Sequence, residues 1–148
     1  MKIRLHLLGL LSLAIMLLSV PALADAKTDV AKNFLVAVSE SNYAAVWNTL
    51  SVKVKKVFIE EASKEFSVTA EEAEKQFASG KGEIPALVWE DFKEELNINV
   101  KNLVLDVDRV EIMNGEEAVI IKDDGENVEL PVVKENGGWY VTFPLDEL

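Results

Sequence analysis

The chain of 148 residues contains no cysteine, and its one histidine is His6. Histidine is the commonest general base in catalysis, and thiolate and imidazole groups are the usual ligands of zinc and softer metals. The absence of cysteine excludes cysteine–histidine catalytic sets and thiolate metal centres, and serine–histidine sets are excluded as well if His6 leaves with a cleaved leader. Glycine-rich phosphate-binding loops are also absent from the sequence. We therefore expect no cofactor and no metal site, and any activity has to use carboxylates, hydroxyls, amines or the shape of a pocket.

The first residues have the pattern of a secretory signal peptide. Lys2 and Arg4 precede an almost wholly apolar run over 5–20, and an Ala-x-Ala cleavage site ends at Ala24, with a second one ending at Ala26. We predict a signal peptide over 1–24 and a single domain over 25–148; a retained membrane anchor is the alternative. Because exported domains without disulfides are typical of bacteria, the expected location is periplasmic or secreted, without membrane attachment after cleavage.

The sequence is short of positive charge. The formal net charge is −11 for the whole chain, and removal of Lys2 and Arg4 with the leader makes it −13. A protein of this charge repels nucleic acid and anionic lipid surfaces, and it attracts cations and basic proteins. We therefore expect no nucleic-acid partner. A basic protein partner remains open, as does the simpler explanation that the acidity maintains solubility.

The first half of the predicted domain has the apolar spacing of α-helices. Apolar residues recur three or four positions apart in five stretches between residues 28 and 97. A polar break at 41–42 separates the first two. Ser51 is expected to cap the third helix, and Thr69 the fourth in a capping box with Glu72, while Gly80 is expected to end the fourth.

After Asn97 the apolar period changes to two, which is typical of strands. The parity of the apolar positions reverses near Asp108–Arg109, which predicts a bulge or a sharp bend. Turn signals at 114–115, 124–125 and 136–138 predict an antiparallel meander of about four strands. Pro131 is expected at an edge or a bulge because it cannot donate to a ladder. The predicted class is α+β, with N-terminal helices packed on a bent sheet.

Two segments carry a family resemblance. Residues 31–51 contain the pair Phe34–Leu35, a polar break before Tyr43 and a second helix ending in Leu-Ser; residues 136–141 combine glycines with Trp-Tyr-Val. This pattern resembles small exported domains of the nuclear transport factor two-like superfamily. The resemblance implies a cone-shaped, cystatin-like α+β fold that closes a curved sheet over a pocket. The superfamily holds isomerases, dehydratases and non-catalytic binding modules, so the resemblance alone selects no function.

Aromatic residues are the candidates for lining such a pocket and binding a small apolar ligand. The predicted lining residues are Tyr43, Trp47, Trp89, Phe92 and Tyr140. At helical spacing such residues also form ordinary hydrophobic cores, and that alternative stays open.

Carboxylates are the candidates for chemistry. Asp106 and Asp108 lie two apart on a predicted strand, where a like-charge pair would raise one pKa, and Tyr140 could donate to a developing oxyanion. The alternative is a solvated strand face. The acidic turn 123–127 is too short for a calcium loop. The sequence thus favours an exported, non-catalytic binding or interaction module. An isomerase- or dehydratase-type enzyme and an acidic, partner-blocking immunity-like protein are the alternatives, and a homodimer remains possible.

Overall fold

The structure, a computed structural model, describes residues 26–95, 106–113, 116–123 and 126–143. Within these ranges helices come first and strands follow, which confirms the predicted α+β class. The predicted signal peptide at 1–24, with its first cleavage site, lies outside the described residues. The elements are α1 (Ala26–Ser39), α2 (Tyr43–Thr49), α3 (Val52–Glu65), α4 (Ala70–Ser79), α5 (Glu83–Glu95), β1 (Asp106–Met113), β2 (Glu116–Asp123), β3 (Glu126–Glu135) and β4 (Gly138–Val141).

Side-chain caps set the helix boundaries, because the first N–H groups of a helix have no partner within it. The Ser51 hydroxyl accepts from the Val54 N–H at the start of α3. The Thr69 hydroxyl likewise accepts from the Glu72 N–H at the start of α4. Both predicted caps are confirmed. The Glu72 carboxylate, which the capping box would have returned to the cap residue, instead accepts from Gln76 Nε2 at 3.3 Å.

Gly80 ends α4 as predicted, and the structure shows why this position requires glycine. Its φ of +64° lies in the left-handed region. A Cβ at this position would also lie 2.4 Å from the backbone nitrogen of Ala44 in α2. The absence of a side chain at this position therefore lets α4 lie directly against α2.

The four strands form one antiparallel sheet in the order β1-β2-β3-β4. The register between β1 and β2 shifts between Val107 and Arg109, so the predicted irregularity is confirmed. The last hairpin turns through Asn136 and Gly137, whose φ values of 49° and 84° are both positive, as a type I′ turn requires. The predicted turns at 114–115 and 124–125 lie outside the described residues, although the strands that flank them pair as hairpins.

Pro131 lies in β3, which has neighbours on both sides rather than an edge position in the sheet. The shortness of β4 explains how the strand tolerates it. The last residue pair between β3 and β4 is Val132 with Val141, so Pro131 lies just beyond the ladder of these two strands. Its carbonyl accepts from the Thr142 N–H at 2.9 Å, and this position needs no donor from residue 131.

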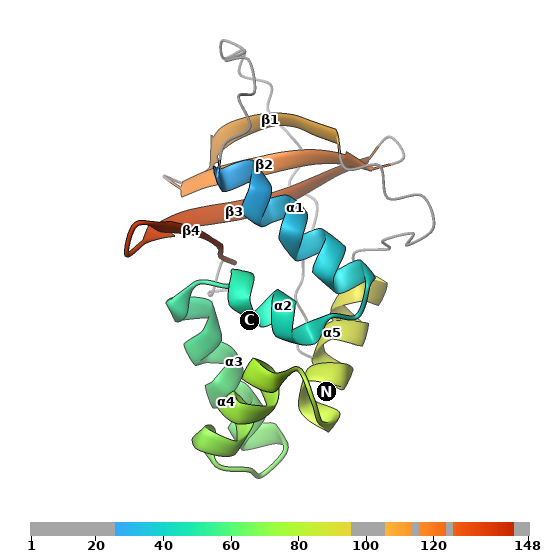
Figure 1. The fold of residues 1–148 in the computed structure, drawn as a ribbon, viewed down its shortest axis with the longest axis vertical. Helices are drawn as coiled ribbons and strands as arrows, with labels where there is room; N and C mark the ends of the chain where they lie inside the picture. The colour runs from blue at the N-terminus through green and yellow to red at the C-terminus, as the bar shows by residue number, and fades with distance from the viewer. Residues whose placement is uncertain (1–25, 96–105, 114–115, 124–125, 144–148) are drawn as a thin grey trace.

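Helix α1 covers one face of the sheet, and the other helices extend beyond its β4 edge. Figure 1 shows α1 lying across the sheet, with α2 to α5 gathered on the far side of β4. Alternate residues of the strands join the core with the helices: Val119, Ile121, Leu130, Val132 and Val141. No helix formed by the described residues is both long and apolar enough to cross a membrane.

The start of α3 is joined to the last hairpin. Leu50 and Val141 form an isolated parallel bridge, and the Ser51 N–H donates to the Val141 carbonyl at 2.9 Å. The Glu135 carboxylate accepts from the Val52 N–H, also at 2.9 Å. These bonds satisfy backbone N–H groups at a helix end that would otherwise lack a partner, and they join the helical part of the chain to the sheet.

Candidate functional site

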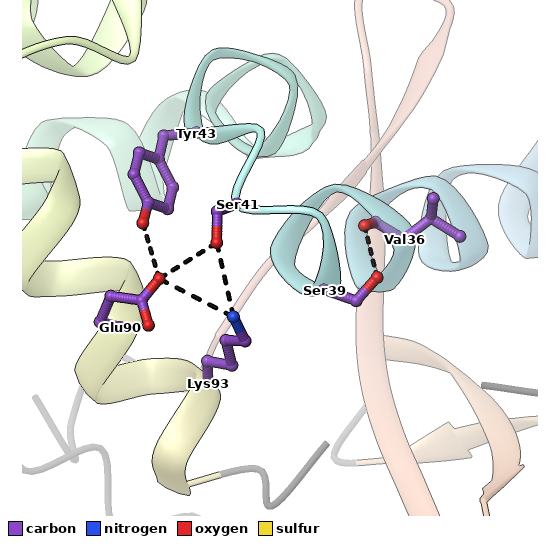
Figure 2. Close-up of polar contacts among 6 residues, drawn as sticks. All are labelled: Val36, Ser39, Ser41, Tyr43, Glu90 and Lys93. Carbon is purple, nitrogen blue, oxygen red and sulfur yellow. Dashed lines mark hydrogen bonds and ion pairs between the residues drawn. The ribbon is translucent and has the colours of Figure 1, made fainter. Parts of the chain in front are cut away.

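Glu90 of α5 is the centre of a polar network at the surface (Figure 2). Its Oε1 accepts from the Tyr43 hydroxyl at 2.7 Å and from the Ser41 hydroxyl at 3.1 Å. Lys93 Nζ lies 3.8 Å from the same oxygen and donates to Ser41 Oγ at 3.4 Å. Ser41 has a φ of 54°, and this left-handed backbone lies in the turn between α1 and α2. The network therefore joins that turn to α5.

The network holds Glu90 in its charged form. The Tyr43 hydrogen bond lowers the pKa of the Glu90 carboxyl, Ser41 and Lys93 lower it further, and partial burial opposes them. The pKa of Tyr43 is raised by burial and by its bond to Glu90, so the phenol stays protonated. A carboxylate held ionised is a weak general base at neutral pH. The arrangement suits the binding of a cation better than proton transfer.

The outer face of α5 continues this acidic character. Glu83, Leu87, Glu90 and Glu94 follow one another at spacings of four, three and four, so they share one side of the helix, and all are exposed. Leu87 is 40 % exposed and is one of the large apolar side chains that the fold leaves in solvent. We call these four residues the α5 strip.

Three of the predicted pocket residues lie inside the protein. Trp47, Trp89 and Phe92 belong to the core, and each is 5 % exposed or less. The Trp89 ring lies 5.3 Å from the ring of Phe58, 6.5 Å from that of Phe77 and 6.0 Å from that of Phe92. The structure thus brings these residues together in one closely packed aromatic cluster.

Within this cluster the indole N–H of Trp89 is buried without a hydrogen-bond acceptor from any described residue. The neighbouring phenylalanine rings have no lone pairs to offer. An unsatisfied buried donor costs about 1–3 kcal/mol, so it is an exception that requires an explanation.

The other two predicted pocket residues lie apart from the cluster core. Tyr43 is partly buried at the start of α2, where it packs against the core and donates to Glu90. Tyr140 lies on β4 opposite Val133, and a Cβ at Gly138 would lie 3.1 Å from its hydroxyl. The structure therefore places the five predicted residues in three settings: the aromatic cluster, the start of α2 and strand β4.

The backbone register separates the residues of the predicted enzyme alternative. Asp106 is aligned through Lys122 of β2 with Asn127 of β3, whereas Tyr140 is aligned with Val133. These two positions of β3 are six residues apart, which is about 20 Å along the strand. The side chains of Asp106 and Asp108 lie outside the described part of the structure.

Sequence reasoning singled out Tyr43 as a pocket residue, but it missed Glu90, Ser41 and Lys93 and the bond between Tyr43 and Glu90. Tyr43 is 47 positions away from Glu90, and Lys93 is 52 positions away from Ser41, so no local motif connects them. The outward spacing of the acidic residues on α5 was the available signal. Among the residues described, no group of three or more acidic, histidine or cysteine side chains is placed to hold a metal ion.

Comparison with protein-family models, with curated proteins and with solved structures found no match to this chain. The resemblance to the nuclear transport factor two-like superfamily therefore stays a prediction from the sequence.

Proposed function

We propose that this protein is an exported, non-catalytic binding module whose α5 strip binds a basic segment of a protein partner. The observation that carries the proposal is the Glu90 carboxylate. It is fixed by three neighbours through one oxygen, and its side chain is still 50 % exposed. A positioned charge of this kind loses little side-chain freedom on binding a cation.

The residues around Glu90 define the partner's chemistry. Leu87 offers an apolar contact between carboxylates one turn away on either side. Lys93, a cation of the same helix, is already engaged with Glu90 and Ser41. A partner helix or loop with a basic rim and an apolar residue at its centre is therefore complementary to the strip. The net negative charge of the chain would speed the encounter.

The proposal can be tested with a synthetic amphipathic peptide of lysine and leucine as the probe. Its affinity is measured by calorimetry for the wild type and for the triple variant Leu87→Ser, Glu90→Gln, Glu94→Gln. We expect the variant to bind about tenfold more weakly, because it removes the apolar anchor and two facing charges. Higher salt should weaken binding to the wild type more than to the variant.

The matched control is Glu71→Gln, Glu74→Gln, which removes the same charge from exposed positions of α4. We expect this control to lose less than half as much binding free energy as the triple variant loses. Equal losses in the two variants would show that only net charge matters, and the proposed strip would then be rejected.

A further inference from the structure

The aromatic cluster contains one ring that is delivered by a separate short helix. Phe77 comes from α4, whose buried residues are Ala73 and Phe77. Its ring is stacked flat on Trp47, with centroids 4.7 Å apart and an interplanar angle of 5°. The same ring borders Phe58 at 6.1 Å and Trp89 at 6.5 Å. Phe77 is thus a planar group held between two indoles and a third ring.

Left-handed backbone flanks α4 on both sides. Ser67 precedes the helix with a φ of 53°, and Gly80 and Gly82 follow it with φ values of 64° and 111°. The helix packs against α2, α3 and α5. A movement of α4 about these two ends would withdraw Phe77 while the other rings stay on their own helices.

We propose that Trp47, Phe58 and Trp89 form a binding site for a planar aromatic ligand that carries a hydrogen-bond acceptor, and that Phe77 fills this site in the free protein. The ligand ring would take the place of Phe77 on the face of Trp47. Its acceptor would receive the indole N–H of Trp89. This inference is independent of the α5 strip, which lies on the exposed side of α5.

The chemistry of the ligand follows from two interactions at this site. Phe77 makes the first, stacking on Trp47, and it cannot make the second, a hydrogen bond with the indole N–H of Trp89. Its ring already supplies the stacking on Trp47, so a ligand gains little over Phe77 by stacking alone. A phenylalanine ring provides no lone pair for Trp89 Nε1, which is buried without an acceptor among the described residues. An oxygen or nitrogen acceptor on the ligand would satisfy this donor, and it is the feature that lets a ligand compete with Phe77.

Anisole and ethylbenzene are matched probes for this idea, because they have nearly the same shape and only anisole has an acceptor oxygen. Their affinities for the intact protein are measured by NMR titration. We expect the wild type to bind anisole about fivefold more tightly than ethylbenzene, the ratio that one net hydrogen bond supplies. Trp89→Phe keeps a ring but removes the donor, and it should make the two affinities equal.

Phe77→Leu tests the role of the filling ring. It keeps apolar volume in the core but removes the flat group, so we expect both probes to bind more tightly than to the wild type. Phe92→Leu is the control, because its ring also lies 6.0 Å from Trp89 but comes from α5 itself. This control should not increase either affinity. Near-UV circular dichroism confirms that each variant is folded.

Three results would overturn the proposal. A preference for anisole that persists in Trp89→Phe would remove the assigned donor. Equal affinities of the wild type for the two probes would show that no donor of the protein binds the anisole oxygen. Binding to Phe77→Leu without any binding to the wild type would show only a cavity made by the substitution. The triple variant of the α5 strip should keep the preference for anisole, so failure of the surface proposal is recognised separately.

Discussion

Trp89 and Glu90 are neighbours in the chain and opposites in their surroundings. The Trp89 indole is 1 % exposed and has a hydrogen-bond donor with no acceptor among the described residues. The Glu90 carboxylate is half exposed, and one of its oxygens accepts two hydrogen bonds and lies next to the Lys93 ammonium. One side of α5 therefore has strong packing with an unsatisfied polar group, and the other has satisfied polar groups with weak packing.

The difference shows that the two sides of the helix contribute to different properties. Burial of a large aromatic side chain stabilises a fold by several kcal/mol, whereas exposed ion pairs contribute about 0–1 kcal/mol. The core side of α5 thus determines stability. The exposed side is free to present a charge for recognition, because substitutions there cost the fold little.

The largest expected effect is that of Trp89→Ala. This change removes a fully buried ring from the cluster with Phe58, Phe77 and Phe92, so we expect a loss of about 3–5 kcal/mol in the free energy of unfolding. Urea denaturation followed by far-UV circular dichroism measures it. A loss below about 1 kcal/mol would mean that the cluster is not packed as described.

The orphaned donor predicts a smaller loss for Trp89→Phe than for Trp47→Phe. Trp89 is the more buried of the two, so burial alone predicts the reverse order. Because Trp89→Phe also removes an unsatisfied N–H, part of its cost is offset, and we expect a difference of about 1 kcal/mol in the same denaturation experiment. The reverse order would indicate that the N–H has a partner.

The polar side of α5 can be tested by the coupling between Tyr43 and Glu90. We expect a double-mutant cycle of Tyr43→Phe and Glu90→Gln to give a coupling free energy of about 0.5–1 kcal/mol, since the bond is short but exposed. Chemical denaturation of the four proteins provides the values. A coupling near zero would show that the network does not hold the carboxylate in place.

The same bond predicts a dependence of stability on acid pH. The folded-state pKa of Glu90 lies below its ordinary value of 4.5, so its contribution is present above that pH. The contribution is lost as the pH falls through the lower, folded-state pKa. The free energy of unfolding, measured from pH 6 to pH 2, should therefore fall less steeply for Glu90→Gln than for the wild type. The two losses should differ by less than about 1 kcal/mol, because the group is exposed. Parallel curves would contradict the shift.

The smallest expected effect is that of Lys93→Gln. Its ammonium lies 3.8 Å from Glu90 and 3.4 Å from the Ser41 hydroxyl, and the pair is partly screened by solvent. We expect a loss of about 0.3 kcal/mol or less at low salt, and none at high salt. A loss comparable to that of the Tyr43 coupling would make Lys93 a principal member of the network.

Local sequence patterns predicted most of the fold. The caps at Ser51 and Thr69, the end of α4 at Gly80 and the bulge beside Arg109 depend on a few adjacent residues, and the structure has all four. The position of Pro131 in an inner strand was harder to predict, because β3 tolerates the proline only where its neighbour β4 ends. The order of helices and strands follows from the change in apolar period after residue 97.

The candidate site could not be predicted in the same way. The spacing of Trp89 and Phe92 identified them as inward-facing, but the choice between a pocket and a core depends on Phe77 from another helix. Glu90 gains its character from Tyr43 and Ser41, which lie more than 40 positions earlier. Contacts at such distances are made by tertiary packing, and no periodicity within one segment records them.

The attachment of the last hairpin to the start of α3 has a consequence for the order of folding. Ser51 and Thr142, which approach one another there, are separated by 91 positions. Because contacts so far apart in sequence form slowly, α3 gains its bridge to the sheet only after nearly the whole chain has left the ribosome. The completion of α3 is thereby coupled to the completion of β4, so we expect amide protection at the start of α3 and along β4 to appear in the same late step of refolding.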